Sequence, residues 1–333
     1  MEGELNPVPP FDFSKSMEFL SSFTPMANEQ KIRVASFTKA VEINGKTVAF
    51  KITGKGDMQD PDIHYTAYSE ERFDDETKSS LLDRITFFLS LQDDLNGFYG
   101  IGQDDENFRH IIKKLYGHKQ VKFLTPFESC CWAILSQRVP MTTAHKMKEK
   151  IVQEIGSHID IGCIDYYAFP EPTKMDAAEE PKLFEAILSR RKSKYLAAAA
   201  KAFSIVDEQW LRSAPYKEVH SWLTDIKGIG DWSANFIMMW GLGRMDELPS
   251  IGLKLALAVS SVYTGEEKPM PEEEIRTLAE KYGKWQGYWA YYIRIYAEFG
   301  GEGLKYAKGS STQTMKAAGT ENSCWPWRQP LEI

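Results

Sequence analysis

Residues 227–233 have the composition of a turn that binds an anion. Gly228 and Gly230 flank one apolar residue, Ile229, and two glycines so placed let the backbone turn through positive φ. We expect one helix to end just before this turn and a second helix to begin at Asp231. The first amides of a helix have no partner within it, so the second helix would present free N–H groups and the positive end of its dipole to a phosphate oxygen. Such a hairpin holds a DNA backbone without reading its sequence.

The string Gly-Ile-Gly-Asp-Trp-Ser-Ala-Asn at 228–235 resembles the hairpin signature of the helix-hairpin-helix DNA glycosylase superfamily. It is most similar to the 3-methyladenine DNA glycosylase II family, in which a tryptophan follows the Gly-x-Gly-x unit. Further segments resemble that family in the same order along the chain, over roughly residues 120–300: 134–139, 169–175, 191–196 and 285–292. There are two alternatives. The segment could be an ordinary glycine turn between two core helices, or the chain could be an unrelated helical protein with a chance hairpin.

The resemblance implies how DNA is held. The turn between the two helices that precede the hairpin supplies, in the family, the wedge that replaces a flipped base. Arg138 would therefore contact the widowed base, and its alternative is a surface arginine at a helix end. Lys227 is either a phosphate contact or a surface lysine. The complete set of expected DNA-binding residues is Gln137, Arg138, Lys227, Gly228, Ile229, Gly230, Trp232 and Ser233.

The position of the catalytic group departs from the family. Loss of the base builds positive charge on the sugar, and a carboxylate near C1′ stabilises that charge. Alignment places Ser250 where the family has its aspartate, and a serine hydroxyl is neutral. Asp246 or Glu247 could be the displaced acid, a change could have removed the acid, or the protein could bind damage without cutting. Bifunctional relatives carry a lysine nucleophile at the position of Trp232, so Schiff-base chemistry is not expected.

Aromatic residues are candidates for a base pocket. Rings in the stripe at 285–292 repeat at helical spacing, which is more often typical of a core, but such rings also stack on purines. The expected base-pocket residues are Trp132, Tyr288 and Tyr291.

No metal or redox centre is expected. Cys130, Cys131, Cys163 and Cys324 do not have the spacing of metal ligands, and only Cys324 lies where some relatives carry a four-cysteine iron–sulfur loop. We therefore predict free thiols, no iron–sulfur cluster and no required cofactor. A monovalent cation held by hairpin carbonyls is implied by the resemblance alone.

The chain of 333 residues has 43% hydrophobic residues and 26% charged residues, which are values of a globular protein. Its net charge of −7 argues against a general nucleic-acid binder but leaves room for a protein that contacts few phosphates. No apolar run has membrane-spanning length, so we expect a cytoplasmic monomer that binds damaged double-stranded DNA and no membrane.

The expected fold class is α+β, with a small N-terminal antiparallel sheet followed by a mostly helical, two-lobed helix-hairpin-helix core. Asn44-Gly45 between two alternating runs predicts a tight β-hairpin. Residues 125–128 read as a capping box with proline at the first helical position. The predicted division is an extended lead-in at 1–30, an α+β domain at 31–120, the helical core at 121–304 and a tail at 305–333.

Two functions remain open from the sequence. The first is a monofunctional DNA glycosylase that excises alkylated purines of the 3-methyladenine type in base excision repair, by base flipping. Its site residues would be Ser250 in the aspartate slot and Asp246 as a displaced acid. The second is a catalytically weak or silent damaged-DNA binding protein on the same fold, which the missing aspartate keeps open.

Overall fold

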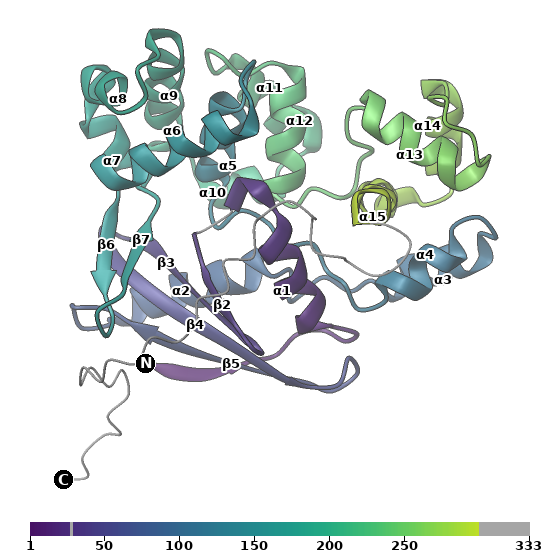
Figure 1. The fold of residues 1–333 in the computed structure, drawn as a ribbon, viewed down its shortest axis with the longest axis horizontal. Helices are drawn as coiled ribbons and strands as arrows, with labels where there is room; N and C mark the ends of the chain where they lie inside the picture. The colour runs from purple at the N-terminus through teal and green to yellow at the C-terminus, as the bar shows by residue number, and fades with distance from the viewer. Residues whose placement is uncertain (27–28, 300–333) are drawn as a thin grey trace, which may run out of the picture.

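The computed structural model describes residues 1–26 and 29–299 of the chain. It consists of a twisted antiparallel sheet, a bundle of helices packed above it and a second group of helices beside both (Figure 1). The expected combination of a small N-terminal sheet with a mostly helical remainder is confirmed. The predicted tail at 305–333, with Cys324, lies outside the described residues.

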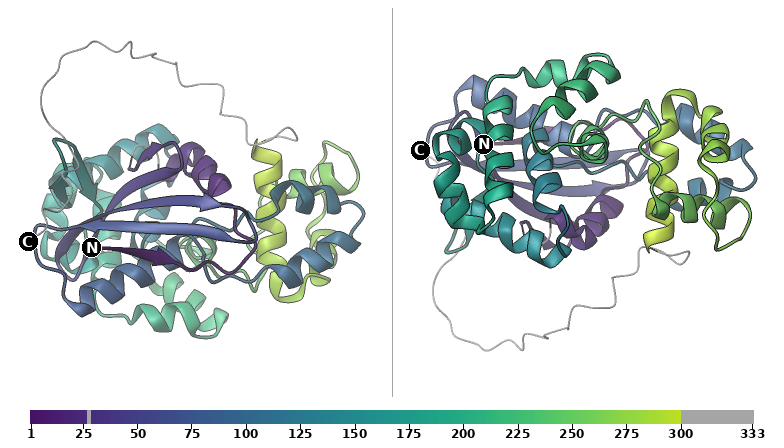
Figure 2. Two further views of the ribbon diagram at one scale, coloured as in Figure 1. Left: turned by 90° about the horizontal axis from the view of Figure 1, so that it is seen from below. Right: turned by 90° about the horizontal axis from the view of Figure 1, so that it is seen from above.

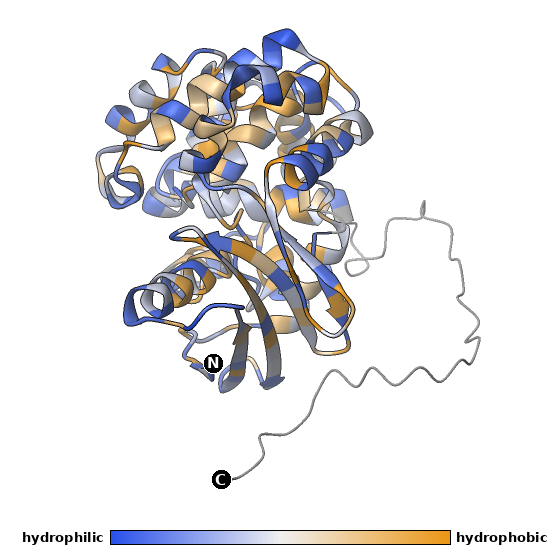
Figure 3. Ribbon diagram, turned by 90° about the vertical axis from the view of Figure 1, so that its left-hand side faces the viewer, coloured by the Kyte–Doolittle hydropathy of each residue, from blue (hydrophilic) through white to orange (hydrophobic). Residues whose placement is uncertain are grey.

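The five-stranded sheet has the strand order β1-β5-β4-β3-β2. Asn44 and Gly45 have φ values of +52° and +76°, so the predicted hairpin between β3 and β4 is confirmed. Side chains of β5 alternate between buried and partly exposed positions. Figure 3 shows hydrophobic and hydrophilic residues following one another along strands of the sheet. The strands are β1 (Glu2–Leu5), β2 (Lys31–Arg33), β3 (Ser36–Ile43), β4 (Lys46–Gly56) and β5 (Pro61–Tyr68).

The first 26 residues are not an extended lead-in, which corrects the prediction made for residues 1–30. β1 pairs with β5 at the sheet edge, and α1 (Phe13–Ser22) is a regular helix followed by the short 3-10 helix η1 (Thr24–Met26). The side chain of Asp12 accepts from the amides of Ser14 and Lys15 and so caps α1. Phe19 is then buried against the core. The helix has fewer than three turns, too few for its periodicity to stand out.

The bundle above the sheet carries the glycine hairpin and the turn at Gln137 and Arg138, called the wedge turn below. Within it, α5 packs against both α9 and α12, and the unpredicted β-hairpin β6–β7 lies against β3 (Figure 1). Its elements are α5 (Pro126–Leu135), α6 (Met141–Glu154), β6 (Ser157–Asp160), β7 (Asp165–Ala168), α7 (Pro172–Ala177), α8 (Glu179–Ile187), α9 (Arg190–Phe203), α10 (Glu208–Ser213), α11 (Tyr216–Asp225) and α12 (Asp231–Trp240).

The second group of helices joins segments from both sides of the predicted boundary at 120. α15 packs against α4 on one side and against α13 and α14 on the other (Figures 1 and 2). The hydroxyls of Tyr99 and Tyr292 lie 3.1 Å apart, and the hydroxyl of Tyr263 donates to Asp105 at 2.6 Å. The elements are α3 (Asn96–Asp104), α4 (Arg109–Leu115), α13 (Leu253–Tyr263), α14 (Glu272–Glu280), η2 (Gly283–Trp285) and α15 (Gln286–Phe299); α2 (Asp75–Phe88) instead packs on β3.

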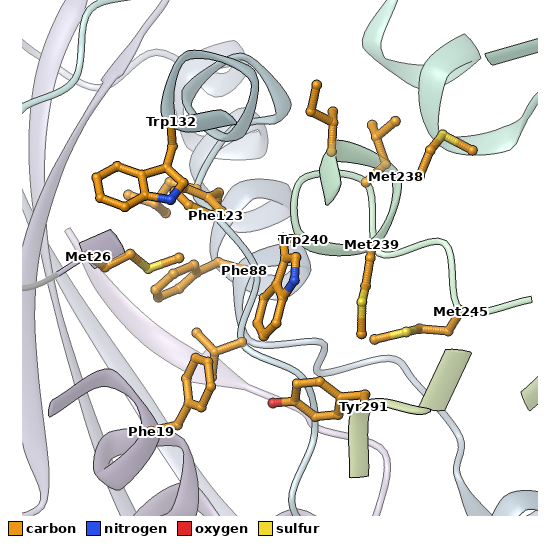
Figure 4. Packing of buried hydrophobic residues seen from close by; sticks show 14 of the residues in the cluster. Phe19, Met26, Phe88, Phe123, Trp132, Met238, Met239, Trp240, Met245 and Tyr291 are labelled. Atoms are coloured by element: carbon orange, nitrogen blue, oxygen red, sulfur yellow. The ribbon is translucent and has the colours of Figure 1, made fainter. Parts of the chain in front are cut away.

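One hydrophobic core connects the three parts. The ring of Phe19 from α1 stacks on Trp240 from α12 at a centroid distance of 6.0 Å, and Trp240 meets the edge of Tyr291 from α15 at 5.6 Å (Figure 4). All three side chains are buried. The end of the hairpin helix is therefore fixed by aromatic contacts to both the N-terminal and the C-terminal parts of the chain.

A buried ion network ties α6 to the N-terminal segment. Nζ of Lys148 lies 2.7 Å from Glu128 and also contacts Glu29, whose other oxygen is 2.6 Å from Lys39. Partial burial opposes the charge of Glu29, but Lys148 and Lys39 overcome that effect and lower its pKa to about 2. Two carboxylates and two ammonium groups thus neutralise one another between the sheet and the helical bundle.

Among the helices of the described ranges, none has the length and apolar content needed to cross a membrane.

Candidate nucleic-acid interface and active site

The glycine hairpin lies at the surface. α11 ends at Asp225, Gly228 has a φ of +98°, and Gly230 precedes the first residue of α12 in extended conformation. Lys227 and Gly230 are exposed, and no side chain caps this end of α12. The first amides of the helix are therefore open to an anion, as the sequence analysis expected.

Two neighbours hold the corner in place. A Cβ on Gly228 would lie 2.3 Å from Cγ of Tyr195, so only glycine fits between this backbone and the ring on α9. The side-chain amide of Gln137 donates to the carbonyl of Gly228 at 2.8 Å. A Cβ on Gly230 would meet nothing within 4 Å, which leaves the solvent side of the corner free for a ligand.

The turn between α5 and α6 presents Arg138 to solvent. Its φ of +54° is in the left-handed region that non-glycine residues rarely adopt, and such strain is common at ligand-binding positions. Nζ of the buried Lys192 braces this turn by donating to the carbonyls of Ile134 at 3.1 Å, Leu135 at 2.5 Å and Gln137 at 2.8 Å. Burial, and then the charge of Arg191, lowers the pKa of Lys192 to about 8.

Lys192 and Tyr195 lie one turn apart on α9, so a single helix supports both the wedge turn and the hairpin.

We predict that Lys192→Met lowers the free energy of unfolding by about 2–3 kcal/mol, because three buried carbonyls lose a charged donor. Urea denaturation measures the change, with Lys194→Met, an exposed position on the same helix, as the matched control. A loss no larger than that of the control would show that the carbonyls find other partners.

Ser250, the residue in the aspartate slot, lies against a carboxylate that the sequence analysis treated only as the start of a helix. Oγ of Ser250 donates to Oδ2 of Asp231 at 3.2 Å, and Nε2 of His220 lies 3.2 Å from Oδ1 of the same group. The three residues come from the loop before α13, from α12 and from α11. The signal in the sequence was an acid directly after Gly-x-Gly and directly before Trp232.

These residues line an open pocket of about 460 Å³ between α11, α12 and the loop before α13. A pocket of this size accommodates a nucleoside. The polar side chains that line it include Tyr216, His220, Asp231, Asn235, Glu247, Ser250 and Arg276.

The displaced acid expected at Asp246 is engaged elsewhere. Its two oxygens accept from Nε and Nη2 of Arg244 at 3.1 Å and 3.0 Å. The third guanidinium nitrogen of Arg244, Nη1, donates to the carbonyl of Ala214 at 2.8 Å, which fixes the pair in place. Glu247 faces the pocket, whereas Asp246 is not among the residues that line it.

The expected base-pocket rings are part of the core, which corrects that expectation. Trp132, Tyr288 and Tyr291 are 1%, 2% and 0% exposed. Tyr288 donates to Asp93, and the hydroxyl of Tyr291 lies 2.9 Å from Nε2 of His118. A base could reach these rings only if the core opened (Figure 4).

Trp232 is instead an exposed aromatic residue in the first turn of α12, directly after Asp231 in the chain. Its side chain is 59% exposed and stacks on Phe236 at a centroid distance of 5.6 Å. By contrast, Ile229 and Ser233 are buried, and the amide of Ile229 donates to the carbonyl of Ile226 at 3.0 Å. Side-chain contacts from these two residues to DNA are therefore excluded, and only backbone contacts remain.

The monovalent cation at the hairpin, which the resemblance implies, stays a prediction. The carbonyls of Leu223, Ile226 and Gly228 each accept one hydrogen bond, from Ile226, Ile229 and Gln137. Each carbonyl oxygen has a second lone pair. Within residues 1–26 and 29–299, no three His, Cys, Asp or Glu side chains are grouped as metal ligands.

Comparison with known proteins matches residues 131–284 to the HhH-GPD superfamily of base excision DNA repair proteins. The chain is 24% identical over 218 residues to a DNA-3-methyladenine glycosylase of Bacillus subtilis, covering 65% of this chain and 72% of that protein. It is 31% identical over 147 residues to a DNA-3-methyladenine glycosylase of Saccharomyces cerevisiae, covering 43% of this chain and 47% of that one. The match thus spans about half the length of the yeast protein.

Solved structures share the fold over most of the chain. The 3-methyladenine DNA glycosylase of Archaeoglobus fulgidus superposes with a TM-score of 0.72 at 23% identity, covering 90% of this chain and 99% of that one. An 8-oxoguanine glycosylase/lyase of Clostridium acetobutylicum in complex with double-stranded DNA superposes with a TM-score of 0.64 at 18% identity. The match covers 90% of this chain and 97% of that one. The N-terminal sheet is therefore part of the shared fold.

Proposed function

Residues 131–284 of this chain form a domain of the HhH-GPD superfamily, and on this basis we propose that the protein is a monofunctional DNA glycosylase that excises alkylated purines. The observation that carries the proposal is the exposed glycine hairpin beside an open pocket that contains the aspartate slot. The hairpin would hold the phosphates on one side of the lesion, and the flipped nucleotide would enter the pocket.

Alkylated purines suit this site better than neutral lesions. A purine alkylated at N3 or N7 is already cationic, so its glycosidic bond breaks without an acid to protonate the base. A carboxylate that stabilises the developing charge on the sugar, together with one water molecule, is then sufficient. We propose that the reaction needs no bound cofactor.

Arg138 and Trp232 would have separate tasks in base flipping. Arg138, exposed and in left-handed conformation, would enter the gap in the duplex and hydrogen-bond the widowed base. Trp232 would stack on the flipped base through its exposed face. Because an indole has no amine, the protein should form no Schiff base and leave the DNA strand intact at the abasic site.

A silent damaged-DNA binding protein is the second candidate, because Ser250 stands in the aspartate slot. A base-release assay separates the two candidates. Duplexes that carry either N3- or N7-methylated purines, uracil or 8-oxoguanine would be incubated with the wild type and with Ser250→Asp. The proposal expects the wild type to release methylated purines and neither neutral lesion. A wild type that is inert on all substrates, together with an active Ser250→Asp, would support the silent protein.

We predict that Trp232→Ala weakens binding of DNA with a flipped alkylated base by about 5- to 150-fold, since stacking contributes about 1–3 kcal/mol per base. Trp232→Phe keeps an aromatic face and should lose much less. Fluorescence anisotropy with the lesion duplex and with undamaged duplex measures the effect. Equal losses on both duplexes would mean that Trp232 contacts the backbone and not the base.

A further inference from the structure

Among the described residues, Asp231 is the acidic residue whose side chain hydrogen-bonds Ser250. Oδ2 accepts from the serine hydroxyl at 3.2 Å, so the carboxylate lies within one hydrogen bond of the slot where the family has its aspartate. We propose that Asp231 is the catalytic carboxylate of this chain, moved from the loop before α13 to the first residue of the hairpin helix. The proposal rests on the glycosylase function proposed above.

Two side chains contact the carboxylate of Asp231, and a third holds its backbone. Ser250 in the loop contacts one oxygen, and His220 on α11 lies 3.2 Å from the other. One turn along α12, the side-chain amide of Asn235 donates to the carbonyl of Asp231 at 2.8 Å and accepts from the hydroxyl of Tyr216 at 3.0 Å. Groups fixed before the substrate arrives need no reorganisation during the reaction, which is the condition for effective charge stabilisation.

The side chain of Asp231 is also accessible. It is 74% exposed and lines the open pocket, so a nucleotide in the pocket would cover it and remove water from it. Glu247 lines the same pocket, but the carboxylate that accepts the hydrogen bond from Ser250 is that of Asp231. Asp246 is already paired with Arg244. These contacts favour Asp231 over the two acids that the sequence analysis considered.

The reaction balances with water as the only co-reactant. The bond between C1′ and the purine nitrogen breaks, and the cationic alkylated purine leaves as a neutral base with the electron pair. The carboxylate of Asp231 stabilises the positive charge that develops on the sugar. Water adds its oxygen to C1′, and its released proton passes through Asp231 to solvent. The products are an abasic site, a free base and one proton.

A structural role predicts a different result. An acid in the first turn of a helix interacts favourably with the helix dipole and so stabilises the fold slightly. If that were the task of Asp231, Asp231→Asn would change stability slightly and leave the reaction rate unchanged. If it is the catalytic carboxylate, single-turnover release of methylated purine should fall by about 10²–10³-fold. Binding to abasic duplex should not weaken, because a negative charge near the phosphates is removed.

The experiment compares wild type, Asp231→Asn, Asp246→Asn and the double variant Asp231→Asn/Ser250→Asp in single-turnover base release and in abasic-DNA binding. Asp246→Asn is the matched control and should release base at the wild-type rate. The double variant places a carboxylate at position 250, the other partner of the hydrogen bond. Its rate of base release should be at least about tenfold higher than that of Asp231→Asn, a difference of 1.4 kcal/mol.

Release by Asp231→Asn within threefold of an active wild type would overturn this inference and leave the glycosylase function standing. So would an active wild type that only Asp246→Asn inactivates. An inert wild type would overturn the proposed function itself, and the inference with it.

Discussion

Gly228→Ala should weaken binding to abasic duplex DNA by about 100-fold. At a φ of +98° any other residue is strained, and the new Cβ would lie 2.3 Å from Cγ of Tyr195. Each of these costs is about 1–3 kcal/mol, and the backbone can escape the clash only by moving away from α9. That movement would displace the carbonyl that Gln137 holds and the amides of α12 that face the DNA.

Gly100→Ala serves as the control for this variant. Gly100 lies in α3, and a Cβ there would meet nothing within 4 Å. Fluorescence anisotropy with a duplex that contains one abasic-site analogue measures the affinity, and circular dichroism reports whether the fold is retained. If folded Gly228→Ala binds as tightly as Gly100→Ala, the hairpin is not the part that grips DNA.

Lys148→Met should lower the free energy of unfolding by about 3–5 kcal/mol, because it leaves the carboxylates of Glu128 and Glu29 without their shared partner. Glu128 is buried and cannot regain water without breaking the core. Chemical denaturation at neutral pH measures the change. Lys150→Met, an exposed lysine on the same helix, should change stability by less than about 0.5 kcal/mol.

The pH dependence gives a second check on this network. The pKa of Glu29 is lowered to about 2 from its ordinary value of 4.5, so its contribution to stability is present above pH 4.5 and is lost as the pH falls toward 2. The stability difference between wild type and Lys148→Met should therefore shrink below pH 4.5. A difference that stays constant from pH 7 to pH 3 would show that lost packing, and not lost charge pairing, causes the effect.

Short sequence patterns correctly predicted the turns and helix caps, because neighbouring residues determine these features. Asn44-Gly45 gave the β-hairpin because a type I′ turn needs positive φ at both central positions. Thr125 caps α5 as expected, since its hydroxyl accepts from the amide of Glu128 at 3.0 Å. The side chain of Glu128, however, pairs with Lys148 across the core, a contact that no short-range pattern indicates.

The missed features depend on contacts between distant segments. Trp132 and Tyr291 have the residue type of a base pocket, but helices packed around them make them core. Asp231 and Ser250 are 19 residues apart, and only the path of the loop before α13 brings the carboxylate to the slot. Asp246 and Glu247 are near the slot in the chain, whereas Asp231, the acid that contacts Ser250, is near it only in space.

The most direct measurement is single-turnover hydrolysis of a methylated duplex by the wild-type protein, with free methylated purine and abasic sites counted in the same sample. We predict one abasic site for each released purine, with the DNA strand unbroken at neutral pH. Release no faster than in buffer alone, by protein that binds abasic DNA normally, would contradict the conclusion that this chain hydrolyses the glycosidic bond of alkylated purines.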